Sequence, residues 1–274
     1  MKKFFTLIGM LLLQQLMPAQ ISGLKPFTIG ESFTMDSEIL GEKRTLNVYL
    51  PGDYHEDSLH EYPVIYLLDG SADEDFIHIA GLVQFCSFSW INIVPQSIVI
   101  GIGNVDRKRD FTYPSGNELD QEDFPTSGGS ENFIRFIEKE LQPLVRKRYR
   151  VSDSRTLIGQ SLGGLLATEI LLKKPELFEQ YIIVSPSLWW DDEALLGLQP
   201  QSPIANKSVY VAVGKEGEVM ERTAQSLYDK ILSEKAANTA VFFTFFEAQN
   251  HGDALHLAVY DAFEKIFKMG SHKN

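Results

Sequence analysis

Thr156-Leu157-Ile158-Gly159-Gln160-Ser161-Leu162-Gly163-Gly164-Leu165-Leu166-Ala167 is typical of a short apolar strand, a tight turn with a serine at its tip, and an amphipathic helix. Gly159, Ser161 and Gly163 fit the G-x-S-x-G pattern of a nucleophile elbow. Such a turn strains the backbone of its serine, and only very small side chains fit on either side. The helix after it directs its N-terminal amides toward the serine oxygen. The alternative is a glycine-rich turn with an incidental serine.

Outward from this stretch, apolar runs bounded by turn residues alternate with helical patterns. We expect strands at 45–50, 63–70, 97–103, 155–158, 181–184, 208–214 and 241–246, and helices at 76–87, from 130 with a kink at Pro143, at 219–233 and at 254–267. This alternation predicts an α/β fold with a mostly parallel central sheet and helices on both faces. A hydrophobic content of 44% in 274 residues suits one domain, residues 21–274.

The polar loops of the chain follow its predicted strands. Because the carboxyl ends of parallel strands meet at one edge of a sheet, these loops are expected to gather on one rim, where ligands and chemistry are found in open α/β sheets. Residues 114–129 are rich in Gly, Ser, Asp and Pro, so we expect a long loop there, and such loops often serve as lids.

A serine hydroxyl needs a base within hydrogen-bond reach, and the base needs an orienting carboxylate. With this type of elbow the groups follow in the chain order serine, acid, histidine. His251 comes after the last predicted strand and before the closing helix, which makes it the candidate base. The acid is expected after strand 208–214, where Glu216 is the first candidate and Glu218 the second.

An oxyanion hole for this chemistry requires two backbone N–H groups. One is expected from Leu162, the residue after the nucleophile, and the other from Gly70 or Ser71 in the loop after strand 63–70.

Two rim loops carry side chains that suit an aromatic, anionic substrate. Arg107 and Arg109 follow strand 97–103, and Trp189 and Trp190 follow strand 181–184. Arginine clamps carboxylates or stacks on aromatic rings. The alternative is that one tryptophan belongs to the core and that the arginines pair with neighbouring aspartates.

Charge and cysteine content limit the possible partners. The net charge is −12 and the chain has no basic stripe, so we expect no nucleic-acid partner. Cys86 is the only cysteine and lies in an apolar run, so it is expected to be a small buried hydrophobic residue. No set of residues with the spacing of a metal site stands out, and the serine chemistry requires neither a metal nor a cofactor.

The N-terminus has the pattern of a secretory signal peptide. Met1-Lys2-Lys3 precedes an apolar run that ends near Ala19, too short for the roughly twenty residues of a spanning helix. We therefore expect residues 1–20 to be removed and the protein to be exported, to the periplasm or outside the cell, without stable membrane insertion.

The chain resembles the Putative esterase group of α/β-hydrolases, most closely its siderophore esterase branch (enterobactin, salmochelin and bacillibactin hydrolases), which is related to esterase D and the feruloyl esterases. The stretches that carry the resemblance are Tyr62–Gly70, Ile100–Gly103, Asp106–Thr112, Gly159–Gly164, Ser185–Trp190 and Asn250–Gly252. It implies the α/β-hydrolase fold, ester hydrolysis with Ser161 as nucleophile and His251 as base, and Arg107 or Arg109 near the substrate. Gln160 stands where this group commonly has a histidine.

Three functions fit these observations. The first is an exported serine esterase that acts on a small-molecule ester through an acyl-enzyme. The second is an acyltransferase on the same fold, since only the acceptor differs. The third is a non-catalytic protein whose Trp and Arg rim holds a ligand. The sequence specifies neither the ester nor the oligomeric state.

Overall fold

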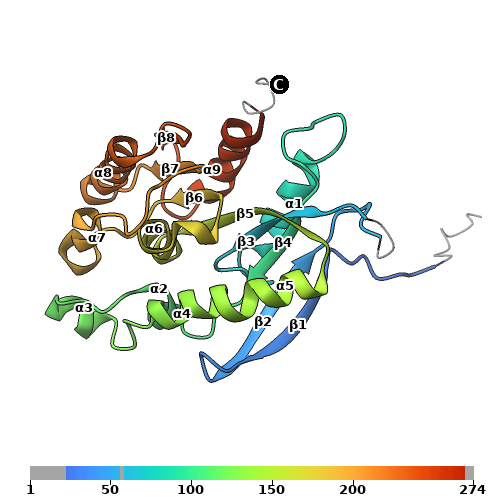
Figure 1. Ribbon diagram of the computed structural model, residues 1–274, viewed down its shortest axis with the longest axis horizontal. Coiled ribbons are helices and arrows are strands. Elements are labelled where there is room, and N and C mark those ends of the chain that lie inside the picture. Colours follow the sequence, from blue (N-terminus) through green and yellow to red (C-terminus); the bar gives the residue numbers. More distant parts are fainter. Residues whose placement is uncertain (1–22, 56–58, 269–274) are drawn as a thin grey trace, which may run out of the picture.

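The computed structural model describes residues 23–55 and 59–268, so the predicted signal peptide lies outside the described residues. Eight strands form one sheet in the order β1-β2-β4-β3-β5-β6-β7-β8 (Figure 1). Neighbouring strands run parallel from β4 to β8, whereas β1 and β2 are antiparallel additions at one edge. The strands are β1 Glu31–Ser37, β2 Glu42–Tyr49, β3 Tyr62–Leu67, β4 Ile98–Ile102, β5 Val151–Gln160, β6 Gln180–Val184, β7 Ser208–Gly214 and β8 Ala240–Phe246.

Helices cover both faces of this sheet, which confirms the predicted α/β class. Successive residues of a strand point to opposite faces, so Val64 and Tyr66 lie in one core and Ile65 and Leu67 in the other. α4, α5, α6 and α8 pack on the first face, and α1 and α9 pack together on the second (Figure 1). Their bounds are α1 Phe76–Cys86, α4 Ser130–Phe136, α5 Gln142–Arg148, α6 Leu162–Lys173, α8 Glu218–Glu234 and α9 Ala254–Phe263.

The predicted kink at Pro143 takes the form of a π-helical turn. The helix that begins at Ser130 widens into a π turn at Ile137–Leu141 and continues as α5 to Arg148. Proline lacks an N–H group and its ring clashes with the carbonyl one turn earlier, and a wider turn accommodates both effects without ending the helix. No helix in the described ranges is long and apolar enough to cross a membrane.

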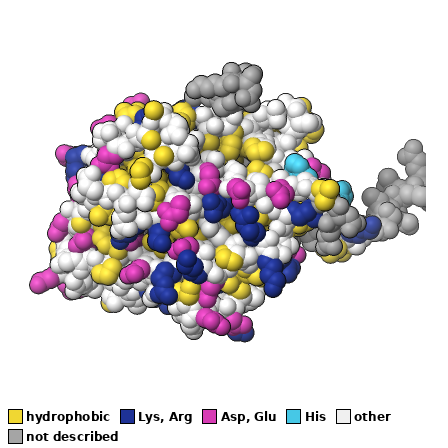
Figure 2. Space-filling model, in the orientation of Figure 1, with side chains coloured by type: hydrophobic (Ala, Val, Ile, Leu, Met, Phe, Trp, Pro, Cys, Tyr) yellow, Lys and Arg dark blue, Asp and Glu magenta, His cyan; other side chains and the backbone are white. Residues whose placement is uncertain are grey.

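The surface over α4 and α5 carries charges of both signs. Figure 2 shows Lys and Arg side chains interspersed with Asp and Glu on this face. Arg146 pairs with Asp153, and Lys139 and Lys174 both pair with Glu138. Such a mixed, exposed set is typical of an ordinary solvated surface.

The segment between β4 and α4 is more regular than predicted. Its charged start forms a short helix, α2 (Arg107–Phe111), whose first turn is capped by the Asp106 side chain on the Arg109 amide. The expected long loop at 114–129 contains another helix, α3 (Glu118–Asp123), capped by Asn117. The same asparagine donates to Asp192, and the Gly116 amide donates to Asp191, so the segment is fastened to the loop after β6.

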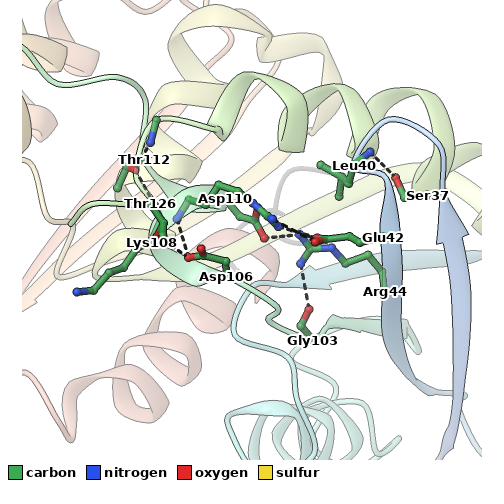
Figure 3. Close-up of polar contacts among 12 residues, drawn as sticks. Ser37, Leu40, Glu42, Arg44, Gly103, Asp106, Lys108, Asp110, Thr112 and Thr126 are labelled. Carbon is green, nitrogen blue, oxygen red and sulfur yellow. Dashed lines mark hydrogen bonds and ion pairs between the residues drawn. The ribbon is translucent and has the colours of Figure 1, made fainter. Parts of the chain in front are cut away.

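A buried charge network ties α2 to strand β2 (Figure 3). Arg44 and Asp110 are each 1% exposed and form an ion pair, and Glu42 accepts from both Arg44 and Arg109. The Arg109 Nε also donates to Asp110 at 2.7 Å. Buried opposite charges in such close contact fix the position of α2 relative to the sheet, because removal of one partner leaves the other charge buried and unpaired.

Candidate active site

Ser161 lies on a strained turn between β5 and α6. Its φ is 59° and its ψ −120°, and its amide donates to Val184 of the neighbouring strand at 3.1 Å. A Cβ added to Gly159 would fall inside the contact radius of the Gly163 carbonyl, so the turn requires glycine there. A non-glycine residue in this backbone region costs energy and survives where the surroundings force it, which is typical of functional positions.

His251 and Glu216 form a close pair beside this turn. The His251 Nδ1 and the Glu216 Oε2 are 2.5 Å apart, and the Glu216 side chain is only 3% exposed. Burial alone would raise the pKa of Glu216, but hydrogen bonds from His251, Ser185 and the Gly214 amide outweigh it and hold that pKa below its usual value. Glu218 is exposed at the first position of α8, so of the two candidate acids only Glu216 meets the histidine.

The elbow and the histidine loop are joined through Gln160. Its side-chain amide donates to the His251 carbonyl at 2.6 Å, which places the histidine loop against the residue before Ser161. Among the described residues, the Ser161 hydroxyl makes its side-chain hydrogen bond with Ser187, at 3.2 Å between the oxygens, and not with the imidazole. Catalytic hydrogen bonds are often long or poorly aligned without substrate and tighten when it binds.

The candidate oxyanion donors differ in whether their amides are already hydrogen-bonded within the protein. The Leu162 amide opens α6 and donates to no other described residue, so it is available to a ligand. The Gly70 amide donates to the Ile102 carbonyl at 3.0 Å, and this sheet hydrogen bond removes Gly70 as a donor. The Ser71 amide has a longer contact, 3.3 Å to the exposed Glu74 carboxylate, and remains the candidate from this loop.

Arg107 lies next to the elbow. Its guanidinium binds both carboxylate oxygens of Asp69, at 2.6 and 2.9 Å, and donates to the Gln160 carbonyl at 3.2 Å. The side chain is 32% exposed, so one side of this fixed positive charge faces solvent near Ser161.

Two of the predicted substrate-binding residues lie elsewhere. Arg109 is directed into the Glu42 and Asp110 network, where it pairs with the buried Asp110 carboxylate and the partly buried Glu42 carboxylate. Trp190 is fully buried, with its Nε1 donating to the Tyr113 carbonyl at 2.9 Å, so it belongs to the core. Trp189 is half-buried against Phe124. For Arg109 and Trp190 the structure therefore agrees with the alternative, an ion pair and a core position. The residue type alone did not indicate which way each side chain points.

Residues that the sequence reasoning missed also converge here. Ser185 donates to Glu216, Ser187 bonds to Ser161, and Asp69 holds Arg107. The available signal was position, because Ser185 and Ser187 directly follow a buried strand on the same rim. In the described part of the chain, no group of three or more His, Cys, Asp or Glu side chains is arranged to hold a metal ion.

Comparison with known proteins identifies the family. The family model described as Putative esterase matches residues 37–260. The chain belongs to this family. A serine hydrolase from Shewanella oneidensis, described as IroE-like, superimposes with a TM-score of 0.78 at 29% identity, covering 87% of this chain and 80% of that chain. The BES protein from Bacillus cereus superimposes with a TM-score of 0.76 at 27% identity, covering 90% and 98%. These neighbours confirm the predicted α/β-hydrolase fold.

Curated proteins with named activities are also similar to this chain. A ferri-bacillibactin esterase from Bacillus subtilis is 32% identical over 183 residues, which cover 62% of this chain and 63% of the relative. A siderophore triacetylfusarinine C esterase from Aspergillus fumigatus is 44% identical over 185 residues, covering 62% and 60%. The chain therefore spans less than two thirds of the length of either relative.

Proposed function

We propose that this protein is a serine ester hydrolase that works through an acyl-enzyme. The observation that supports the proposal is a strained serine turn beside a His251 imidazole that is paired with a buried Glu216 carboxylate, on adjoining loops of one rim. A strained nucleophile, an imidazole and an acid that fixes the imidazole are the three parts that activation of a serine hydroxyl requires. The named esterase activities of the relatives support the same reaction class.

In the proposed reaction the Ser161 oxygen attacks the ester carbonyl carbon while its proton passes to His251 Nε2. Glu216 holds the Nδ1 proton and stabilises the imidazolium that forms. The developing oxyanion accepts hydrogen bonds from the Leu162 and Ser71 amides. The carbon–oxygen bond to the leaving alcohol then breaks, and this alcohol takes the proton from His251. Water, deprotonated by His251, attacks the acyl-enzyme and releases the acid and free Ser161.

The proposed substrates are esters of siderophores. The two named relatives are esterases of siderophores, and the guanidinium of Arg107, paired with Asp69 but partly exposed beside the elbow, offers N–H donors to an anionic acyl or aryl group. The His251 side chain is about half exposed, so the reacting atoms face solvent and a bulky ester has access. A panel of short aryl esters, feruloyl sugars and catecholate trilactones, with and without iron, ranks these classes by kcat/KM. Preference for the feruloyl sugars would contradict the siderophore assignment.

Replacement of the nucleophile tests the reaction class. Ser161→Ala is expected to lower kcat by about 10³-fold or more, because the rest of the site retains only binding and oxyanion stabilisation. Ser233→Ala removes an exposed hydroxyl from α8 and is the matched control with unchanged activity. A fluorophosphonate probe should label the wild type and Ser233→Ala but not Ser161→Ala. Full activity in Ser161→Ala would contradict the proposal, and acyl transfer to added alcohols in preference to water would make the protein a transferase.

The proposal includes export. Residues 1–20 have the basic start, apolar run and small-residue end of a signal peptide. N-terminal sequencing of protein recovered from outside the cytoplasm should begin near residue 20, and an intact Met1 on a retained protein would contradict export.

A further inference from the structure

The two oxygens of the Glu216 carboxylate have different partners. Oε2 faces the His251 imidazole, while Oε1 accepts the Ser185 hydroxyl and the Gly214 amide, the latter at 2.9 Å. The donors on Oε1 come from the ends of two different strands, β6 and β7. One oxygen of the acid is therefore held by the scaffold, and this leaves the other for the base.

Ser185 is itself held in an unfavourable backbone conformation. Its φ is 44°, in the left-handed region that favours glycine, and the residue is completely buried. Its amide donates to the Ala212 carbonyl at 2.7 Å, which continues the sheet beyond the end of β6. A glycine would adopt this conformation without strain, whereas the serine adds a hydroxyl that is directed at Glu216. The strain is consistent with a requirement for that hydroxyl.

The length of the acid explains why such a donor is useful. Glutamate has one more methylene and one more rotatable bond than the aspartate that most often orients a catalytic histidine. Its carboxylate can therefore adopt more conformations unless other groups hold it. We propose that Ser185 is a positioning residue, whose hydroxyl, together with the Gly214 amide, fixes the Glu216 carboxylate so that Oε2 faces His251. This inference rests on the proposed function, since it assigns a role within the same site.

The loop that carries Ser185 also touches the nucleophile. The Ser187 amide donates to the Ser161 carbonyl at 3.0 Å, and its hydroxyl lies 3.2 Å from the Ser161 hydroxyl. Pro186, between the two serines, packs so closely on Gly164 that a Cβ there would lie 2.9 Å from the Pro186 Cα. The segment Ser185–Ser187 thus contacts both the acid and the elbow, and it sets their separation.

A double-mutant cycle tests this role against a merely structural one. Ser185→Ala is expected to lower kcat about tenfold with KM unchanged, the size expected for losing one hydrogen bond to a charged group. In a Glu216→Ala background the same change should have no further effect on kcat, because no carboxylate remains to position. Ser97→Ala is the matched control, since Ser97 is a buried serine whose hydroxyl bonds to the Pro95 carbonyl at the opposite end of β4. Additive losses in the cycle would overturn the inference.

A spectroscopic readout separates this inference from the proposed reaction. In the wild type the His251 Nδ1 proton should give a resolved downfield proton resonance, which Ser185→Ala broadens or shifts and Ser97→Ala leaves unchanged. Ser185→Gly, which relieves the backbone strain, gives the same result if the alanine variant fails to fold. An unchanged resonance in both Ser185 variants overturns the positioning role. A changed resonance in a protein without Ser161-dependent ester turnover upholds the positioning role and rejects the proposed function.

Discussion

Glu216 and Glu218 stand two positions apart after β7, and only Glu216 turns its carboxylate toward the imidazole. Glu216→Gln is therefore expected to lower kcat by roughly 10³- to 10⁴-fold, because an amide favours the wrong imidazole tautomer and does not stabilise the imidazolium. Glu218→Gln is the matched control on an exposed residue and should keep wild-type kcat and KM. Steady-state kinetics on one aryl ester decide between them, and comparable losses in both variants would contradict the assignment of Glu216.

Asp75 carries a testable pH dependence near the same rim. Its partial burial raises its pKa to about 6, with help from Asp69 and Glu74 and against the opposing charge of Arg107. The folded state then binds a proton more tightly than the unfolded state, so this group lowers the free energy of unfolding as the pH rises from about 3.8 through about 6.

Asp75→Asn should therefore raise the free energy of unfolding at pH 8 by about 1 kcal/mol. This value is smaller than the pKa shift of Asp75 alone would give, because solvent screens a partly exposed carboxylate. Asparagine is also a good residue at the start of α1, so the substitution itself does little harm. Urea denaturation of both proteins at pH 8 and at pH 3.5 measures the difference, which should vanish at the lower pH. A gain of equal size at both pH values would show that the carboxylate charge is not its cause.

Individual site residues were predictable where chain order or a motif restricted them. Ser161 follows from its glycine pattern, and His251 is the histidine in the loop between the last strand and the closing helix. The directions of Arg109 and Trp190 were not predictable, because a charged or aromatic side chain next to a strand end can point to the rim, the core or a neighbouring ion pair. The role of Ser185 depends on a neighbouring strand that pairs only in the folded sheet.

Among the elements, the β5–α6 junction requires glycine at position 159, whereas α1 has room for a side chain at Gly81. Gly159→Ala is expected to destabilise the protein by about 2 kcal/mol or more, because its new Cβ meets the Gly163 carbonyl and forces the turn apart. Gly81→Ala is the matched control in α1, where an added Cβ meets no atom within 4 Å, and it should stabilise by about 0.5–1 kcal/mol. Thermal or denaturant unfolding of both variants measures the change in the free energy of unfolding, which should be a loss for Gly159→Ala and a gain for Gly81→Ala. A stabilised Gly159→Ala would contradict the turn geometry.

The buried strands were predictable as elements because their apolar runs have no competing interpretation, as at Ser208–Gly214. β1 was missed because it is an edge strand whose side chains are largely exposed, so its residues do not show the pattern of a buried face. α2 was missed because a five-residue helix carries no periodicity, and only its Asp106 cap marks its start. β5 begins earlier than predicted, at Val151, which pairs with Tyr62 of β3 and is buried in the core. The polar residues 152–154 that follow lie at an irregularity in this pairing and interrupt the apolar pattern of the strand.

At the scale of the whole molecule, Cys86 reports on opening of the fold. It is fully buried in the core between α1, α9 and the sheet, and burial raises its pKa to about 11. Because the thiolate is the reactive form, a thiol reagent at pH 8 should label the native protein only as fast as the core opens. Labelling followed against urea concentration should accelerate in step with loss of tertiary structure. Rapid labelling that does not depend on urea would contradict this burial.

The rim draws its groups from loops spread between Asp69 and His251, and the last of these follows β8. During synthesis Ser161 is therefore made well before His251, and the proposed nucleophile and base come together only when the final strand joins the sheet. In the proposed mechanism an unfinished or partly unfolded chain thus carries an inert hydroxyl, which neither consumes esters nor becomes acylated. On refolding, ester turnover should accordingly recover later than secondary structure. The return of turnover then reports when the final strand has joined the sheet.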